Sequence, residues 1–177
     1  TDGLDPTGGQ HWEAVLQGIA AAVGPVAQAV LGLPYHGEIA AVSAAQISAA
    51  ARLFGAGTLV LNDVEIAFDG ALAGEDGVLI LAGTGSMAWA RGPLGTHRVG
   101  GWGDLFGDEG SAFWIGREAL ARISQELDGR RDGGLAASLL PRIGVPADGV
   151  SAWAYGLDNP RAGIAALAEE VSALAQA

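Results

Sequence analysis

Residues 58–86 have the sequence TLVLNDVEIAFDGALAGEDGVLILAGTGS, and this stretch decides the fold class. Residues 58–61 form a short apolar run, residues 64–72 have helical spacing, and residues 78–82 form a second continuous apolar run. Continuous apolar runs of this length are typical of buried strands in parallel sheets. The stretch therefore predicts strand, helix, strand, which is the repeating unit of an α/β fold.

The segments on both sides continue the alternation. Residues 26–33 predict a strand, although a helical turn near residues 27–30 is an alternative. Residues 11–23 and 43–54 predict helices. The second helix has Ser43 as its expected N-cap and Gly55 as its expected end. Residues 86–91 and 96–99 predict a β-hairpin. Turn-forming residues fill positions 1–10, and helices are expected at 112–127, 135–140 and 162–177. This order predicts a partly parallel sheet with ligands at the carboxyl ends of its strands.

Composition excludes several classes of function. The chain has 177 residues, half of them hydrophobic, which is enough for a packed core, and its net charge of −11 combines 20 acidic with nine basic residues, all arginine. A nucleic-acid or anionic membrane surface would need a basic stripe that is missing here. The chain has no cysteine, which excludes iron–sulfur clusters and thiolate metal sites within it. His11, His36 and His97 lack metal-ligand spacing and are predicted as surface or turn residues.

A glycine-rich turn, Gly83-Thr84-Gly85-Ser86, follows the second apolar run. Two glycines allow the backbone to turn sharply, and the hydroxyls and N–H groups that remain could hold a phosphate without lysine. A hairpin turn without any ligand would have the same sequence. The neighbouring motifs have to decide between these alternatives.

Asp63 follows the first apolar run and is expected to project from the end of a strand. Its carboxylate could accept the proton of a hydroxyl group that attacks a phosphoryl group. The alternative is that Asp63 only caps the helix predicted for residues 64–72.

A third cluster, GGWGDLFGDEGS at residues 100–111, combines an aromatic ring and three carboxylates with five glycines. So many glycines reduce stability, which suggests that the backbone approaches a ligand closely. A sugar fits, because carboxylates and backbone groups bind hydroxyls and an aromatic face covers C–H groups. The alternative is an acidic capping loop, and we expect Glu109 or Ser111 to cap the next helix and Asp108 to bind the ligand.

Taken together, Leu61-Asn62-Asp63, Gly83-Thr84-Gly85-Ser86 and the segment 100–111 resemble the N-acetylglucosamine kinases within the BadF/BadG/BcrA/BcrD ATPase family. The resemblance implies a two-lobed, ribonuclease-H-like fold of the actin-like ATPase type, of which this chain would hold a part. Residues 1–62 would be the remainder of the N-terminal lobe, and residues 63–177 would be part of the C-terminal lobe.

The same resemblance implies transfer of the γ-phosphoryl group of ATP, with Mg²⁺, to the 6-hydroxyl of N-acetylglucosamine or glucosamine. Asp63 would be the general base, and the remaining site residues would be Gly83, Thr84, Gly85 and Ser86 for the phosphates and Gly101, Trp102 and Asp108 for the sugar. A cytoplasmic location and a homodimer are further implications. Neither a nucleic acid nor a membrane is expected as a partner.

Two segments of the family pattern are not found in this sequence. Residues 1–24 contain no phosphate loop of the Asp-Gly-Gly-Thr type, and no adenosine-binding glycine-rich segment is recognised before residue 177. We therefore expect the polypeptide alone to be close to inactive. Two alternatives remain: an activating ATPase of the same superfamily, which would carry cysteines, and a non-catalytic sugar-binding remnant.

Overall fold

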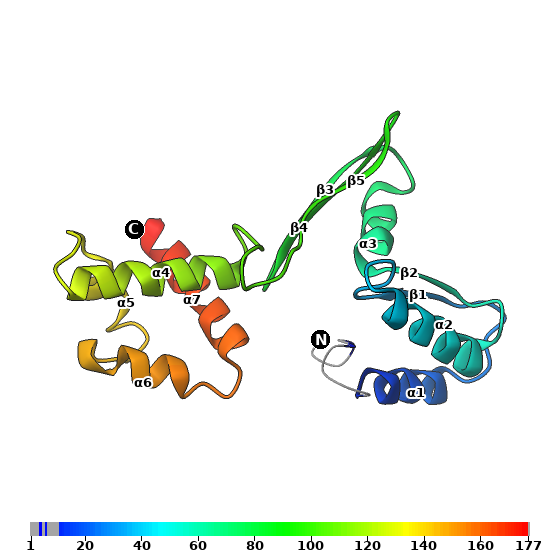
Figure 1. Ribbon diagram of the computed structural model, residues 1–177, viewed down its shortest axis with the longest axis horizontal. Coiled ribbons are helices and arrows are strands. Elements are labelled where there is room, and N and C mark those ends of the chain that lie inside the picture. Colours follow the sequence, from blue (N-terminus) through cyan, green and yellow to red (C-terminus); the bar gives the residue numbers. More distant parts are fainter. Residues whose placement is uncertain (1–3, 5, 7–10, 177) are drawn as a thin grey trace. The chain divides into compact units, whose positions relative to one another are not determined.

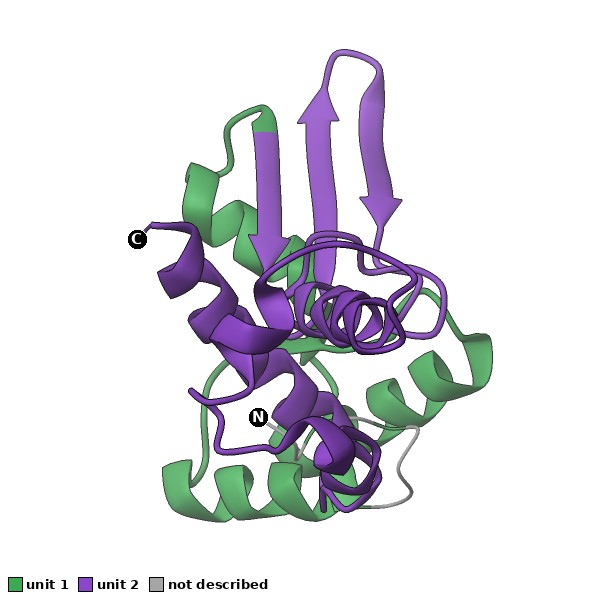
Figure 2. Cartoon of the chain, turned by 90° about the vertical axis from the view of Figure 1, so that its left-hand side faces the viewer, with its two compact units in different colours: residues 1–77 green, residues 78–177 purple. Residues whose placement is uncertain are grey.

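A computed structural model describes residues 4, 6 and 11–176 of the chain (Figure 1). Most of the turn-rich segment predicted at residues 1–10 lies outside the described residues. The chain divides into two compact units, Thr1–Gly77 and Val78–Ala177 (Figure 2), which are described separately below. The predicted lobe boundary after residue 62 stays a prediction.

The described residues of unit 1 form two parallel strands and three helices: α1 (His11–Val23), β1 (Val30–Leu33), α2 (Ala40–Phe54), β2 (Leu59–Asn62) and α3 (Asp63–Leu72). Strands β1 and β2 are paired from Val30↔Leu59 to Leu33↔Asn62, so they end side by side. One cluster of buried side chains in this unit consists of Trp12, Leu16, Leu33, Ala49, Ala50 and Val60, and Phe68 of α3 is also fully buried. The predicted alternation of helices and strands is thus present, with β1 shorter than the run at residues 26–33.

Helix α2 differs from the prediction at its beginning. It starts at Ala40 with Ile39 in the N-cap position, so the prediction of Ser43 as N-cap is wrong. The Ser43 hydroxyl donates to the carbonyl of Ile39 at 3.1 Å and accepts from the N–H of Gly37 at 2.9 Å. Ser43 therefore satisfies a donor in the preceding turn, which allows the helix to begin one turn earlier. The predicted end at Gly55 is confirmed, with φ of 101°.

Unit 2 combines a three-stranded sheet with helices. The strands β3 (Gly77–Ala82, whose first residue closes unit 1), β4 (Ser86–Gly92) and β5 (Gly95–Gly100) lie in the order β3-β4-β5. Strands β4 and β5 form the predicted antiparallel hairpin. The helices are α4 (Ala112–Leu127), α5 (Leu135–Leu139), α6 (Val150–Tyr155) and α7 (Pro160–Ala175), with a 3₁₀ turn at Ala147–Gly149. The 3₁₀ turn and α6 were not predicted, and none of the described helices is long and apolar enough to cross a membrane.

Helices α4 and α7 pack closely against each other in unit 2. A Cβ atom on Gly116 of α4 would lie 2.0 Å from the carbonyl oxygen of Ile164 in α7, so the two backbones meet at a position that only glycine allows. Ser111 is the N-cap of α4, as expected, and its hydroxyl accepts from the N–H of Trp114 at 3.1 Å. The beginnings of both helices are thereby fixed within this unit.

Candidate functional site

Asp63 is the first residue of α3 and directly follows β2. The N-cap is Asn62, whose side-chain oxygen accepts from the N–H of Val64 at 2.9 Å; Asp63 Oδ1 accepts from the same N–H at 2.9 Å. Asp63 is exposed, and it lies in the first helical turn, where the helix dipole favours a negative charge. The structure thus gives the capping position to Asn62 and places the Asp63 carboxylate at the carboxyl end of a parallel strand.

The side chain of Asn62 connects this strand end to the turn after β1. It is buried, with the residue 6 % exposed, and its Nδ2 donates to the carbonyl of His36 and to Glu38 Oε1, both at 3.0 Å. Because β1 and β2 end in register, the turn at residues 34–38 and Asp63 start from the same edge of the sheet. Sequence reasoning assigned no role to Asn62 or Glu38; a polar residue at the end of an apolar run was the available signal.

Gln46 of α2 holds the same turn from the other side. Its side chain is fully buried, its Nε2 donates to the carbonyl of Pro34 at 2.8 Å, and its Oε1 lies 3.0 Å from His36 Nδ1. A buried amide with partners on both ends fixes the backbone that it bonds. The turn beside Asp63 is therefore hydrogen-bonded to unit 1 from two sides, by Gln46 and by Asn62.

In unit 2, residues 83–86 connect β3 to β4 and are tied to the start of α4. The N–H of Ala112 donates to the carbonyl of Gly83 at 2.8 Å, and the Ser86 hydroxyl donates to the carbonyl of Glu109 at 2.7 Å. Within the loop, the N–H of Gly83 donates to the carbonyl of Gly85 at 2.9 Å. Thr84 is exposed, whereas the Ser86 hydroxyl bonds the protein itself. Thr84 is thus the loop hydroxyl better placed to meet a phosphate.

Asp108 lies against this loop. Its side chain is only 5 % exposed, its backbone is in the left-handed region with φ of 57°, and its Oδ2 accepts from Arg161 Nη2 at 3.3 Å. A Cβ atom on Gly85 would lie 2.7 Å from the same Oδ2. The structure therefore brings the predicted phosphate loop and the predicted sugar carboxylate into direct contact, through a position that glycine keeps open.

Trp102 and Gly101 lie earlier in the same segment. Trp102 is 73 % exposed, so its ring is open to solvent on unit 2, as stacking on a sugar would require. The backbone around it is held by arginines: Arg98 donates to the carbonyl of Gly101, and Arg117 donates to the carbonyl of Asp104 at 3.1 Å. Arginine side chains thereby order a glycine-rich segment that has no regular secondary structure of its own.

The predicted site residues thus fall into two sets. Gly85, Ser86 and Asp108 lie close together in unit 2, whereas Asp63 belongs to unit 1. The described residues contain no group of three or more His, Cys, Asp or Glu side chains that could hold a metal ion. Mg²⁺ bound together with a nucleotide needs only one or two carboxylates, since phosphates and water supply the other ligands.

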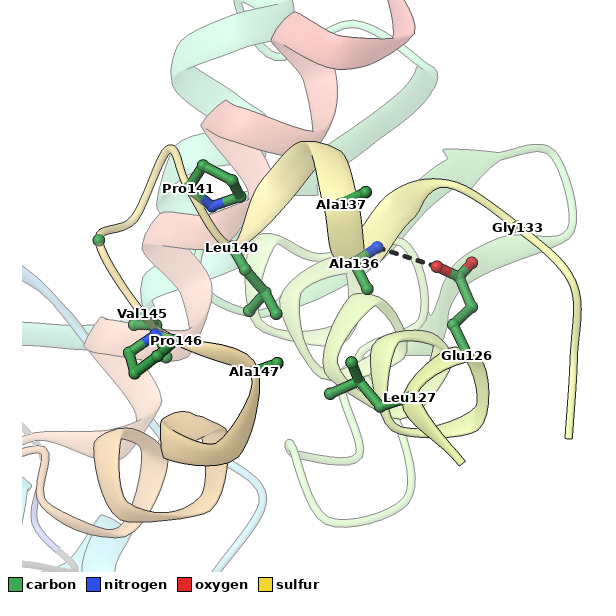
Figure 3. A pocket seen from close by; sticks show the side chains of 11 residues that line it. Glu126, Leu127, Gly133, Ala136, Ala137, Leu140, Pro141, Val145, Pro146 and Ala147 are labelled. Atoms are coloured by element: carbon green, nitrogen blue, oxygen red, sulfur yellow. Dashed lines mark hydrogen bonds between the residues drawn. The ribbon is translucent and has the colours of Figure 1, made fainter. Parts of the chain in front are cut away.

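A cavity of about 670 Å³ in unit 2 lies apart from these residues (Figure 3). It is lined mainly by apolar groups around the end of α4 and the turn after α5, and one polar wall is Glu126. The Glu126 carboxylate accepts from the N–H of Ala136 at 2.9 Å. With a rise of about 1.5 Å per residue, Glu126 lies roughly 22 Å along α4 from Ser111. No predicted site residue lines this cavity, which is too far from the loop to belong to the same nucleotide.

Comparisons with known proteins give one family and several relatives. The family model described as "BadF/BadG/BcrA/BcrD ATPase family" matches residues 10–177. An N-acetylmuramic acid/N-acetylglucosamine kinase of Clostridium acetobutylicum is 40 % identical over 73 residues, which are 41 % of this chain and 24 % of that protein.

Solved structures with the same fold include two candidate N-acetylglucosamine kinases. The protein from Chromobacterium violaceum is 32 % identical, with a TM-score of 0.72, over 94 % of this chain and 61 % of that one. The protein from Porphyromonas gingivalis is 22 % identical, with a TM-score of 0.61, over 92 % of this chain and 57 % of that one, and it supports the fold alone. The chain thus spans about three fifths of these solved relatives, and the predicted α/β fold of the actin-like ATPase type is confirmed.

Proposed function

The chain belongs to the BadF/BadG/BcrA/BcrD ATPase family, and from this premise we propose that it is part of an ATP-dependent kinase of an amino sugar, N-acetylglucosamine or glucosamine. The observation that carries the proposal is the exposed carboxylate of Asp63 at the carboxyl end of β2, next to the buried Asn62, whose side chain bonds the N–H of Val64 and the turn after β1. The relatives named as sugar kinases support the substrate class. Family membership supports the use of ATP.

In the proposed reaction, Asp63 accepts the proton of the sugar 6-hydroxyl while that oxygen forms a bond to the γ-phosphorus of ATP. The bond between this phosphorus and the oxygen of the β-phosphate breaks, and ADP leaves. Catalysis of phosphoryl transfer depends mostly on positioning and on charge stabilisation, so a base held by a buried amide suits it. Mg²⁺, when bound, would neutralise charge on the phosphates.

The phosphates and the sugar are assigned to unit 2. Gly83, Thr84, Gly85 and Ser86 form the loop that would hold the phosphates through N–H groups and the Thr84 hydroxyl. Trp102 would stack on the sugar, and Gly101 and Asp108 would bind its hydroxyls. This assignment is favoured by the contact of Gly85 with Asp108, because both substrates of a kinase have to meet.

The test is ADP release by the full-length protein with and without N-acetylglucosamine. Asp63→Asn should lower kcat by about a thousandfold or more, in line with the loss of a general base, and should leave the Kd of the sugar within a factor of about three. Glu65→Gln, on the same helix turn, is the matched control and should retain activity. An Asp63→Asn protein with wild-type kcat would rule out the assigned base.

We also propose that residues 1–177 by themselves have little sugar kinase activity, because they span about three fifths of the solved relatives. The sugar-dependent rate of the isolated chain, compared with that of the full-length protein, tests this point. A rate of the order found for the full-length protein would contradict it. The homodimer and the cytoplasmic location implied by the resemblance remain predictions.

An activating ATPase of the same family is the second candidate. Such a protein would need cysteines for an iron–sulfur cluster, and the absence of cysteine from these 177 residues disfavours it. Calorimetry separates the kinase from the third candidate, a non-catalytic sugar-binding protein. Only a kinase should bind N-acetylglucosamine with an affinity that changes when ATP and Mg²⁺ are present.

A further inference from the structure

Arg161 is a charged residue to which neither the motifs nor the proposed function gave a role. It is the second residue of α7, its side chain is 43 % exposed, and its Nη2 donates to Asp108 Oδ2 at 3.3 Å. Within the described part of the chain, its Nε is buried and has no hydrogen-bond partner. The same Nη2 would lie 3.2 Å from a Cβ atom on Gly85. One guanidinium group thus bonds the predicted sugar carboxylate and lies next to the predicted phosphate loop.

Helix stability does not explain an arginine at this position. The first turn of a helix carries partial positive charge, which favours carboxylates and disfavours cations. The N-cap of α7 is already provided by Asn159, whose side-chain oxygen accepts from the N–H of Ala162 at 3.0 Å. A buried Nε–H without a partner adds a further cost. What Arg161 does in return is to neutralise the buried carboxylate of Asp108.

The position of Arg161 is fixed by the packing of its helix. Gly116 of α4 allows the backbone of α7 to approach at Ile164, one turn after Arg161. At the other end of the contact, Ser111 caps α4 three residues after Asp108. The guanidinium and the carboxylate are therefore carried by two helix beginnings that are packed together, which limits how far either can move.

We propose that Arg161 is a positioning residue of the site: it holds the Asp108 carboxylate in place against Gly85, in the orientation in which Asp108 binds a sugar hydroxyl. This inference rests on the proposed function, because it takes Asp108 as a sugar ligand. Arg161 acts through Asp108 and is not assigned a contact with either substrate. Loss of Arg161 should therefore weaken sugar binding more than it slows the chemical step.

The test uses the full-length protein, with N-acetylglucosamine as the probe. Arg161→Met should raise the KM and the calorimetric Kd for N-acetylglucosamine by about tenfold or more, as expected for a charge-assisted hydrogen bond. The KM for ATP should change by less than about threefold, because the loop itself is intact. Arg161→Lys should recover part of the loss, since it keeps the charge but not the fork of donors. The melting temperature of each variant shows whether it is still folded. Because Arg161→Met alone leaves the buried carboxylate of Asp108 unpaired, the double variant Asp108→Asn/Arg161→Met is measured as well.

Arg142→Met is the matched control. Arg142, in the turn after α5, also pairs with a carboxylate, since its Nη1 lies 3.1 Å from Glu170 Oε2 on α7, and this partner is not a site residue. The inference would be overturned if Arg161→Met had the same KM and Kd for N-acetylglucosamine as Arg142→Met and the wild-type protein turned over the sugar normally. A wild-type protein that neither binds N-acetylglucosamine nor releases ADP with it would overturn the proposed function, and this inference with it.

Discussion

The side-chain amide of Asn62 donates a hydrogen bond of 3.0 Å to a carboxylate oxygen of Glu38, and so joins the turn after β1 to the residue that precedes Asp63. A second bond of 3.0 Å goes to the carbonyl of His36. Asn62 itself is buried, which limits competition from water for its amide, whereas Glu38 is exposed. The carboxylate proposed as the base is therefore positioned by a residue that never needs to touch a substrate.

Asn62→Ala should destabilise the chain and slow catalysis together. The change leaves the carbonyl of His36 and the N–H of Val64 without the amide, and such losses cost about 1–3 kcal/mol for a buried group. Urea unfolding measures the stability, and kcat of the full-length protein measures the effect on Asp63. Glu38→Gln is the control, because its amide oxygen can still accept from Asn62, and its stability should stay within about 0.5 kcal/mol of wild type. Equal stability of Asn62→Ala and wild type would contradict the positioning role.

Gly85→Ala should disturb the contact between the loop and Asp108. The added Cβ atom would lie 2.7 Å from Asp108 Oδ2 and 3.2 Å from Arg161 Nη2, so a buried and paired carboxylate has to move. Overpacking of this kind costs about 1–3 kcal/mol. The KM values for ATP and N-acetylglucosamine should both rise in the full-length protein.

Gly92→Ala is the matched control for that change. Gly92 ends β4 in the same sheet, and a Cβ atom there would meet no heavy atom within 4 Å. Its kinetics and unfolding should stay close to wild type. If Gly85→Ala and Gly92→Ala behave alike, the loop has more space around Gly85 than the structure provides.

The parts of the fold that depend on local sequence could be predicted. Polar residues before an amphipathic run predicted a cap of α4 at Glu109 or Ser111, of which the structure has Ser111, and apolar segments around a tight glycine turn predicted the β4–β5 hairpin. Both signals act within a few residues. Ser43 had the same capping chemistry, but the turn before α2 offered the N–H of Gly37 as a partner instead. That competition depends on how the chain folds back, which sequence periodicity does not report.

The contacts that hold the candidate site could not be predicted in the same way. Asn62 and Glu38 are 24 positions apart, and Asp108 and Arg161 are 53 positions apart. Asp63 and Asp108 were found because motifs surround them, and Asn62 stands in the same motif as Asp63, whereas Glu38 and Arg161 stand in ordinary turn and helix sequence. Only the pairing of β1 with β2 and the packing of α4 on α7 bring the partners within hydrogen-bond distance.

Gly116→Ala should destabilise unit 2, because its Cβ atom would lie 2.0 Å from the backbone oxygen of Ile164. A backbone atom cannot turn aside as a side chain can, so α4 and α7 would have to separate, at a cost of about 2 kcal/mol or more. Gly70→Ala in α3 is the control, and its effect on stability should have the opposite sign. It has no atom within 4 Å of the added Cβ and should stabilise its helix by about 0.5–1 kcal/mol. Thermal unfolding of both variants checks the two signs.

Glu126 should make the stability of the chain depend on pH below about 4.5, which is the ordinary pKa of its carboxyl group. The N–H of Ala136 foremost, then the hydrogen bond and charge of Arg122, lower the pKa of Glu126 from its ordinary 4.5, although burial opposes them. A carboxyl whose folded pKa is depressed contributes stability above its unfolded pKa and loses it as pH falls through the folded pKa. Relative to Glu126→Gln, the wild-type chain should therefore keep a constant advantage near neutral pH and lose it below about pH 4.5.

Urea unfolding at a series of pH values measures that advantage, with Arg122→Met as a second variant. Arg122 Nε lies 3.1 Å from Glu126 Oε1, while Glu126 Oε2 accepts from Ala136. Arg122→Met removes one donor and leaves the other, so the loss of stability in acid should become smaller without disappearing. A difference between wild type and Glu126→Gln that stays constant from neutral pH to the acid limit of folding would mean that the Ala136 N–H does not favour the ionised carboxyl.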